Sequence, residues 1–454
     1  MITKFSCVIA ILIFSALSVF PFSVSFEGNS RSVVEIEGNK STGLDYIYVA
    51  YNSKEIDKLS ISGLSGTVFD IKRYSNLGGG FAEDVPFSVS DGRIIISKPE
   101  GNIGYLLSTS TGTSAFWLVD YASQPLHLSS INLLSDQDCE STSIEITGSG
   151  EPIHYYTIDG RQQVLSREIL LEYNTLEWNV EQSIYDQVSK QKTLDAIGRV
   201  LLIPPVYSST TFNVKGDRFL KVWESEQTIE SSVFRPNAVM VNSFAEQTNG
   251  NQDDADNSSN VIAGETSGLG GSAPADISFT GYISDAVLHT EWQMATDGEF
   301  DNILYRFNEQ DFNYTFLEEG QYYIRFIGSN ADGSCEAIGD TYEVTIGASD
   351  LRIPNAFSPN NDGVNDVWKV GYRSLIEFEC WIYNTKGTQL FHFKDPSDGW
   401  DGKYKGRAVN PGVYYYVIQA LGADGKKYKK SGDINILNYK KIGESTVETP
   451  SEEE

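Results

Sequence analysis

The sequence predicts an all-β protein built from tandem β-sandwiches that end in a small C-terminal sandwich. The chain of 454 residues is rich in aromatic side chains, with 25 Tyr, 23 Phe and 7 Trp. Its Val, Ile, Thr and Tyr recur in short alternating runs, which suit the pleated, half-buried face of a strand. Turn residues separate these runs at even spacing, a pattern typical of sandwiches. At roughly 100–200 residues per domain, the length predicts three or four domains.

The N-terminus has the pattern of a secretory signal peptide over residues 1–25. An apolar run over 5–20 follows a positive charge, and Ser23 and Ser25 are the small residues expected before a cut ahead of Phe26. An uncleaved membrane anchor is the alternative. No later stretch is long and apolar enough to cross a membrane as a helix, so the pattern predicts an exported protein.

Two sandwiches are expected in the first half of the exported chain. Breakers at 78–80 and 99–102 separate strands of the first sandwich. Pro204 and Pro205 end a strand of the second, because proline cannot continue a central strand. The polar segment 185–198 is left open as a loop or a short helix. The strongest predicted strands are 45–51, 67–71, 93–97 and 115–121 in the first sandwich, and 143–147, 154–157, 200–203 and 219–223 in the second.

A change of composition precedes a third sandwich. Residues 247–273 are rich in Asn, Asp, Ser and Gly, with too few apolar residues to offset their ordering entropy. The strands expected beyond them, at 291–294, 320–326 and 341–346, resemble the PKD-like and immunoglobulin-like repeats of bacterial surface proteins. The predicted divisions are a signal peptide over 1–25, immunoglobulin-like sandwiches over 26–124 and 125–246, a flexible acidic and Gly/Ser-rich linker over 247–273, a PKD-like or immunoglobulin-like sandwich over 274–349, the C-terminal sandwich over 350–438 and an acidic tail over 439–454.

Charge and cysteine usage narrow the classes of function. The formal net charge of −28 leaves no broad basic surface for phosphates, so nucleic acid is not expected as a partner. Cys139, Cys335 and Cys380 lie in separate segments without a C-x-x-C pair. We expect buried single thiols and no zinc site. A bridge between Cys139 and Cys335 is left open.

Three motifs follow one another in the C-terminal sandwich. They are F-S-P-N-N-D-G-V-N-D over 357–366, W-D-G over 400–402 and N-P-G-V-Y-Y-Y over 410–416. The first is a cluster of turn residues, and the Asp-Gly pair of the second is a hairpin signal. Because the segment after Gly412 is strongly apolar, this part of the chain predicts a small sandwich of about seven strands.

This order of motifs resembles the gliding-motility-associated C-terminal domain, the type B sorting domain of Bacteroidetes proteins secreted by the type IX system. The resemblance implies that a signal peptide takes the chain across the inner membrane and that the outer-membrane translocon then reads the folded domain. The family usually ends with a basic residue after its last strand, whereas an acidic tail follows here. The sorting or docking residues carried over are Asn360, Asp362, Gly363, Asn365, Asp366, Trp400, Asp401, Gly402, Pro411, Gly412, Tyr414 and Tyr416.

The C-terminal sandwich is locally basic within an acidic chain. Residues 367–440 contain twelve Lys or Arg against seven Asp or Glu. Lys426, Lys427, Lys429 and Lys430 are predicted on one hairpin. This patch is expected to be either a solvated hairpin, or a contact with an acidic face of the export machinery or with anionic surface polysaccharide.

The sequence favours neither a cofactor nor catalysis. Asp362, Asn365 and Asp366 offer hard oxygens around Gly363, as calcium prefers, but the EF-hand spacing and its terminal Glu are missing. We favour an Asx-type turn, with calcium as the weaker alternative. The chain has four dispersed histidines and no H-E-x-x-H, G-x-S-x-G or P-loop motif, so we expect no enzyme. A hydrolase built on distant carboxylates is the least favoured function.

The expected role is that of a non-enzymatic protein at the outer-membrane surface or outside the cell, exported by the type IX machinery. One alternative is a structural accessory of the secretion or gliding apparatus, docked on an outer-membrane β-barrel protein. Another is an adhesin-like binding protein, whose contacts would lie in exposed loops and apolar patches of the first two sandwiches. Loss of an accessory should block the secretion of other proteins, whereas loss of an adhesin should not.

Overall fold

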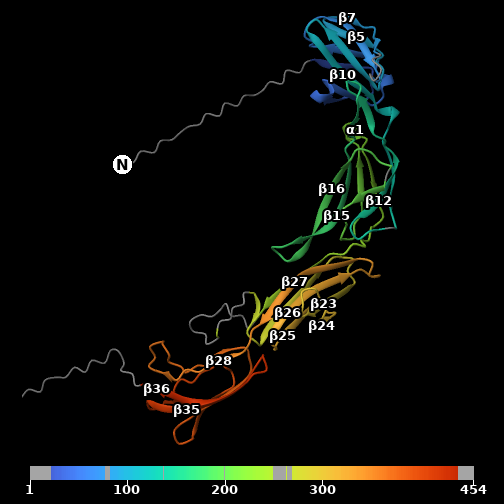
Figure 1. The fold of residues 1–454 in the computed structure, drawn as a ribbon. Coiled ribbons are helices and arrows are strands. Elements are labelled where there is room, and N and C mark those ends of the chain that lie inside the picture. Colours follow the sequence, from blue (N-terminus) through green and yellow to red (C-terminus); the bar gives the residue numbers. More distant parts are fainter. Residues whose placement is uncertain are drawn as a thin grey trace, which may run out of the picture. The chain divides into compact units, whose positions relative to one another are not determined.

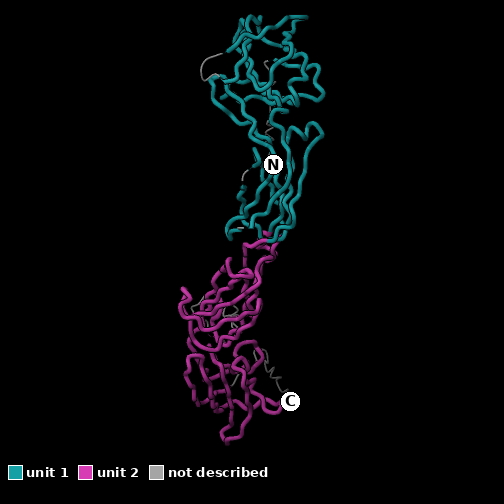
Figure 2. Tube along the Cα trace, turned by 90° about the vertical axis from the view of Figure 1, so that its right-hand side faces the viewer, with its two compact units in different colours: residues 1–175, 187–235 teal, residues 176–186, 236–454 magenta. Residues whose placement is uncertain are grey.

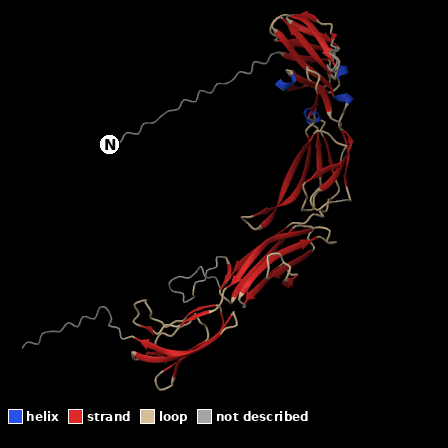
Figure 3. Ribbon diagram, viewed as in Figure 1, coloured by secondary structure: helices blue, strands red, loops and turns tan. Residues whose placement is uncertain are grey.

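The computed structural model describes residues 22–76, 82–135, 137–198, 200–248, 262 and 268–437. Nearly all of its regular structure is strand (Figure 3), so the predicted all-β fold class is confirmed. The chain forms two compact units, one of residues 1–175 and 187–235 and the other of residues 176–186 and 236–454 (Figure 2). Within the described ranges, no helix is long and apolar enough to cross a membrane.

The first sandwich packs a four-stranded sheet against a six-stranded sheet (Figure 1). In the larger sheet β10 pairs in parallel with β3 and antiparallel with β9. Phe116 and Leu118 of β10 are fully buried in the core that they share with Leu59 of the smaller sheet. The smaller sheet has the order β1 (Ser23–Glu27), β4 (Lys58–Ser62), β8 (Arg93–Ser97) and β7 (Ser88–Ser90), and the larger has the order β2 (Val34–Glu37), β3 (Tyr46–Ala50), β10 (Gly112–Asp120), β9 (Ile103–Thr109), β5 (Val68–Tyr74) and β6 (Glu83–Asp84).

The N-terminal strand changes the predicted end of the signal peptide. Phe22 is buried, with its ring centroid 5.3 Å from the tyrosine ring that begins β3, and β1 pairs with β4 from Ser23 onward. The predicted cut ahead of Phe26 therefore falls inside a paired strand and would remove most of it. Ser23 and Ser25 occupy exposed positions of β1, in which exposed and partly buried residues alternate. Small residues spaced in this way also fit the pattern ahead of a signal-peptide cut. Residues 1–21 of the predicted peptide lie outside the described residues.

The second sandwich shares its hydrophobic core with the first. Ile144, Leu171 and Phe212 form one continuous cluster with Val49 and Trp117 of the six-stranded sheet. The polar segment that the sequence leaves open lies mostly in strand β16, where partly buried and exposed residues alternate. The sheets have the orders β11 (His127–Leu133), β12 (Thr142–Ser149), β17 (Val200–Ile203); β13 (Ile153–Tyr156), β14 (Gln162–Leu165); and β16 (Ile184–Leu194), β15 (Ile169–Asn179), β18 (Asn213–Gly216), β19 (Gln227–Glu230).

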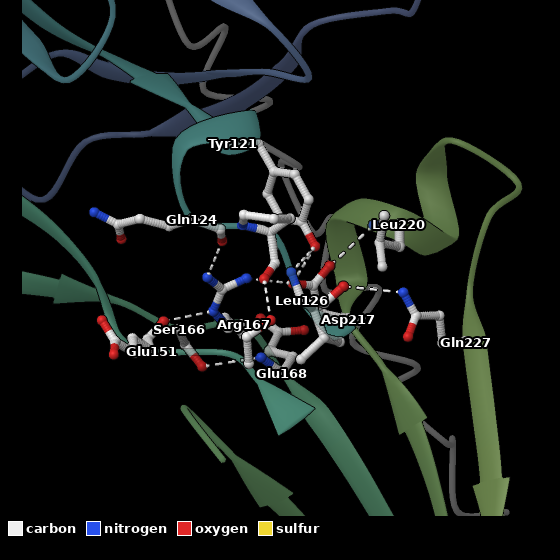
Figure 4. Close-up of polar contacts among 12 residues, drawn as sticks. Tyr121, Gln124, Leu126, Glu151, Ser166, Arg167, Glu168, Asp217, Leu220 and Gln227 are labelled. Carbon is white, nitrogen blue, oxygen red and sulfur yellow. Dashed lines mark hydrogen bonds and ion pairs between the residues drawn. The ribbon is translucent and has the colours of Figure 1, made fainter. Parts of the chain in front are cut away.

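A buried ion pair joins the first two sandwiches (Figure 4). The guanidinium of Arg167 lies 2.8 Å from the carboxylate of Asp217, and both side chains are fully buried. Arg167 also donates to the backbone carbonyls of Gln124 and Glu151, and Asp217 accepts from the hydroxyl of Tyr121 at 3.0 Å. Hydrogen bonds from both sides of the junction therefore complete the pair, as a buried ion pair requires.

Asp217 also begins a helix where the sequence predicts a strand. Its other carboxylate oxygen accepts from the backbone N–H of Leu220 at 3.0 Å, the usual role of a helix N-cap. The predicted strand at 219–223 is therefore wrong, because helix α1 (Arg218–Val222) occupies most of it. The periodicity of a short apolar run does not distinguish a strand from a helix. Here the N-cap at Asp217 favours the helix.

The cysteines of the described part differ in their oxidation state. Cys139 and Cys335 are disulfide-bonded, so the prediction of buried single thiols is wrong for these two residues. Cys380 is a free, fully buried thiol, as predicted.

Two strands of the third sandwich lie where the sequence predicts other elements. Strand β20 pairs with β22, although the predicted second sandwich extends to 246, and β21 pairs in parallel with β27 inside the predicted linker 247–273. Gly270 explains why β21 forms inside the predicted linker. It has a φ of +102°, and a Cβ there would lie 2.3 Å from the carbonyl oxygen of Thr345. This glycine serves a close approach of backbones rather than flexibility. The sheets have the orders β20 (Val241–Gln247), β22 (Ala275–Ile283), β25 (Asp311–Phe316) and β21 (Leu269–Gly271), β27 (Glu336–Ile346), β26 (Gly320–Ser329), β23 (His289–Ala295), β24 (Ile303–Phe307).

The C-terminal sandwich is built on one five-stranded sheet. Its two longest neighbours, β35 and β36, form a hairpin (Figure 1). The predicted acidic tail over 439–454 lies outside the described residues. The five-stranded sheet has the order β29 (Ala356–Phe357), β36 (Lys427–Ile436), β35 (Gly412–Gly422), β31 (Leu375–Tyr383) and β32 (Gln389–Phe393), and the small pairs are β28 (Asp350–Arg352) with β30 (Gly371–Arg373) and β33 (Lys403–Tyr404) with β34 (Arg407–Ala408).

Candidate docking surface of the C-terminal sandwich

Two buried tryptophans form the centre of the C-terminal sandwich. Trp368 and Trp400 are fully buried, and their backbones exchange hydrogen bonds of 2.9 and 3.0 Å. The indole N–H of Trp368 donates to the carbonyl of Pro354 at 2.8 Å, and that of Trp400 donates to the carbonyl of Lys403 at 2.9 Å. The tryptophan of the W-D-G motif is therefore buried and holds a loop to the core.

The other two residues of the W-D-G motif form a turn. Asp401 accepts from the backbone N–H of Lys403 at 3.0 Å and pairs with its ammonium at 2.7 Å. Gly402 has a φ of +74°, a conformation that glycine adopts without strain. The motif therefore directs the chain from the core into β33.

The N-P-G-V-Y-Y-Y motif combines a turn with core packing. Pro411 and Gly412 are exposed at the start of β35. Tyr414 is buried and donates its hydroxyl to the carbonyl of Asn410 at 2.7 Å. Tyr416 packs against the Trp368 ring, with centroids 5.6 Å apart. Both tyrosines that the sequence proposes for docking thus stabilise the sandwich from inside.

The carboxylate of Asp366 organises the exposed loop of the first motif. It accepts the backbone N–H groups of Asn360 at 2.7 Å, Asn361 at 2.5 Å and Gly363 at 2.8 Å. Partial burial acts to raise the pKa of Asp366, but these donors outweigh it and hold the pKa below its usual value. Asp362 likewise accepts from the N–H group two residues further on, at 2.8 Å.

These hydrogen bonds give the calcium candidates a structural role. The carboxylates of Asp362 and Asp366 face donors of their own loop. Asn365 has a φ of +53°, and its carbonyl accepts from the N–H of Ser358 at 2.9 Å. Across the described ranges, no group of three or more His, Cys, Asp or Glu residues is arranged to hold a metal ion. The loop has the geometry of an Asx-type turn, and calcium binding stays a prediction.

All four predicted lysines are exposed at the turn and the beginning of β36. Lys427 and Lys429 alternate with buried Tyr428, so their side chains leave the same face of the sheet. The ammonium of Lys426 lies 4.7 Å from the centre of the Tyr428 ring. A hydrogen bond to Tyr428, followed by the charges of the tyrosine and nearby acids, raises the pKa of Lys426.

A hollow on the outer face of the five-stranded sheet gathers further charges around Lys427 and Lys429. It is also lined by Glu377, Glu379 and Lys394 from the neighbouring strands. Glu379 contacts His392 at 2.8 Å and Lys394 at 3.4 Å, and the hydrogen bond from the histidine is the main cause of its lowered pKa. Among the described residues, no ion pair joins Lys427 or Lys429 to a carboxylate.

The structure separates the two groups of residues that the sequence proposes for docking. The loop 360–366 follows β29, whose Ala356 pairs with Asn435 at the end of β36. The lysines lie at the opposite end of β36, where this strand begins. Lys430 is five residues from Asn435, which is about 17 Å at about 3.4 Å per residue. Lys394 lines the same hollow as Lys427 and Lys429 but was missed, because only the pairing of β32, β31, β35 and β36 brings it there. Its alternation with buried Phe393 is the one local signal.

Two segments of the chain match known protein families. Residues 133–231 match the fibronectin type III domain, and residues 351–436 match the CHU_C type IX secretion signal domain. The second match confirms that a sorting domain lies at the C-terminal end of the described chain. Together the two matches support an extracellular multidomain protein that is exported by the type IX system.

Among the solved structures that match the chain are two distant likenesses. The tetra-tandem repeat in the extending region of a large adhesion protein aligns over 85% of this chain and 96% of that chain, with 12% identity and a TM-score of 0.23. Fibronectin(III)-like modules of CbhA from Clostridium thermocellum align over 38% of this chain and 90% of that chain, with 11% identity and a TM-score of 0.17. No curated protein matches the chain. Scores this low carry no argument about function.

Proposed function

We propose that this chain is a non-enzymatic Bacteroidetes protein that the type IX system delivers to the outer-membrane surface. An N-terminal signal peptide takes it across the inner membrane, and the outer-membrane translocon then reads the folded C-terminal sandwich. The preceding sandwiches serve outside the cell as spacers or binding modules. No cofactor is needed for this role.

One observation carries the docking part of the proposal. The motif residues of the C-terminal sandwich are used for turns and core packing, whereas Lys427 and Lys429 are exposed on its outer face. Exposed charges without a local partner are available to steer and orient another molecule. We therefore propose that the lysines, with Lys394 of the same hollow, contact an acidic face of the export machinery.

The same geometry supports a non-catalytic role. Trp400 lies in the core, and Asp366 and Asp401 accept backbone N–H groups of their own loops. None of these polar side chains is left for acid–base chemistry. A structural accessory docked on an outer-membrane β-barrel protein would use the same lysines, and loss of the gene distinguishes it by blocking the secretion of other proteins.

The route is tested with the full chain in a bacterium that has a type IX system. We expect the protein at the cell surface or in the medium of the parent strain, and in the periplasm of a strain without the outer-membrane translocon. Surface protease digestion and fractionation measure the distribution. Equal surface exposure in both strains would refute type IX export.

The lysine contact is tested by replacing Lys426, Lys427, Lys429 and Lys430 with Gln in the full chain. We expect the variant to fold but to accumulate in the periplasm. The matched control replaces Lys369, Lys386, Lys405 and Arg407 of the same sandwich by Gln, which removes the same charge. Unchanged secretion of the first variant, with loss of binding to purified anionic polysaccharide, would move the contact from the machinery to the polysaccharide.

A further inference from the structure

The third sandwich and the secretion signal domain meet at a closely packed junction. Strand β27 ends at Ile346 and β28 begins at Asp350, so only the segment 347–349 connects the two sandwiches. Three other backbone segments, at 271–273, 373–374 and 422–424, join it through hydrogen bonds. Both sandwiches belong to the same compact unit.

Ser374 lies at the centre of this junction. It is fully buried and has a φ of +49°, an uncommon conformation for a residue with a side chain. Its N–H donates to the hydroxyl of Ser272 at 2.7 Å, and its hydroxyl donates to the carbonyl of Gly347 at 2.6 Å. Its carbonyl accepts from the N–H of Ala423 at 2.9 Å. Ser374, a residue of the signal domain, thus forms hydrogen bonds with groups of both sandwiches.

The same junction holds the turn of the lysine-bearing hairpin. The hydroxyl of Ser349 donates to the carboxylate of Asp424 at 2.6 Å, and the hydroxyl of Tyr428 donates to the Ser349 carbonyl at 3.1 Å. The carbonyl of Ala423, at the hairpin turn, accepts from the N–H of Glu319 in the third sandwich at 3.1 Å. The turn of the hairpin that carries the lysines is therefore held to the junction and is not a free, solvated element.

We infer that the third sandwich is part of the export signal, because the junction at Ser374 fixes the direction in which the lysine hairpin faces the secretion machinery. This inference rests on the proposed function. A docking patch that is already ordered loses less conformational freedom on binding than one that must be ordered by its partner. The export-competent unit is then the pair of sandwiches from about residue 236 to 437, and not the signal domain alone.

The first test places a methyl group inside the junction of the full chain. A Cβ at Gly422 would lie 2.1 Å from the hydroxyl oxygen of Ser349, so Gly422→Ala must displace the hairpin or the connection. The matched control is Gly298→Ala in the third sandwich, where the nearest atom to a Cβ lies 3.6 Å away. We expect the amides of Ser374 and Ala423 to exchange at least about tenfold faster in the first variant only.

The second test places like charges together at the same junction. Ser349→Asp sets a buried carboxylate against Asp424, whereas the control Ser397→Asp sets an exposed one against Asp395, whose carboxylate the serine contacts at 2.7 Å. We expect both junction variants to keep the strand content of the parent chain by circular dichroism. We also expect them to lose most of their secretion, while both control variants are secreted like the parent chain.

The outcomes separate this inference from the function on which it rests. Normal secretion of the junction variants despite faster exchange would overturn the inference and leave type IX export intact. Unchanged exchange in both variants would show that the junction does not order the hairpin, and would also overturn it. Surface exposure of the parent chain without the translocon would refute the proposed function itself.

Discussion

At the scale of single residues, burial and hydrogen bonding decide what each charged or polar group does. Arg167 and Asp217 are fully buried, which would be unfavourable without the carbonyls and the tyrosine hydroxyl that complete their hydrogen bonds. Asp366 is partly exposed, yet it is committed to three backbone donors. In contrast, Lys427 and Lys429 carry charge with no local role. Charged groups with hydrogen-bond or ion-pair partners inside the chain therefore stabilise the fold, whereas charged groups without such partners are available to contact another molecule.

The Arg167–Asp217 pair should be sensitive to loss of one partner. We expect Arg167→Met to lower the free energy of unfolding by about 3–5 kcal/mol, because Asp217 is left buried and unpaired. The control is Arg218→Met, which removes the partly exposed pair with Glu168 and should lower it by less than about 1 kcal/mol. Urea unfolding measures both, and equal effects would contradict the prediction.

The pKa of Asp366 predicts a specific dependence on pH. Since its pKa is lowered in the folded state, its ionised form stabilises the loop fully above the usual pKa of about 3.9 and loses this effect as the pH falls through the lower folded pKa. We expect Asp366→Asn to lower the melting temperature at pH 7 and the difference to shrink below about pH 4. Asp398→Asn, at an exposed position, serves as the control, and a difference that grows in acid would contradict the prediction.

Cys380 should be chemically inert in the folded protein. Burial raises the pKa of its thiol to about 12, so almost no thiolate is present at pH 8. We expect iodoacetamide to leave Cys380 unmodified in the native chain and to alkylate it fully in guanidinium chloride. Peptide mass spectrometry measures the difference, and rapid native alkylation would show that the core opens readily.

At the scale of elements, the sequence predicts strands better than it predicts their partners. Alternating runs such as those around Ile144 and Val344 locate strands because side-chain orientation is a local property. Membership of a sheet is not local, so β20 and β21 were assigned to the wrong elements, and the run around Phe219 formed a helix after a cap. The motifs of residues 357–416 predicted the signal domain, but Lys394 and Ser374 reach their places only through long-range pairing.

Strand β1 leads to a prediction about the N-terminus of the exported protein. A cut ahead of Phe26 would remove the buried Phe22 and three residues that pair with β4. We expect signal peptidase to cut earlier, so that the mature chain retains Phe22. N-terminal sequencing of the surface-exposed protein measures this. A first residue of Phe26 would contradict the prediction and leave only Phe26 and Glu27 to pair with β4.

At the scale of the whole molecule, the chain is organised in compact units larger than one sandwich. The first two sandwiches share one hydrophobic core and a buried ion pair, and the third sandwich shares a polar junction with the signal domain. Composition and turn spacing predict each sandwich separately, because these patterns report the strands and the apolar residues of one sandwich at a time. They carry no information about cores and hydrogen bonds that extend across a predicted boundary.

The shared core predicts that the first two sandwiches unfold together. We expect the slowest amides of β10 and β15 to exchange with the same free energy of opening, and Arg167→Met to lower both by the same amount. Native-state hydrogen exchange measures these values residue by residue. A variant that lowers the value in β15 and leaves β10 unchanged would show that the two sandwiches open separately.

The short connection of residues 347–349 also bears on how this secretion signal can be used in gene fusions. A reporter joined directly ahead of Asp350 would remove the Ser349 hydroxyl that donates to Asp424 and the Ser272 hydroxyl that accepts from Ser374. A reporter joined ahead of Pro236 would leave those contacts untouched. We therefore expect a fusion point at the boundary of the matched signal domain to deliver less reporter outside the cell than a fusion point one sandwich earlier.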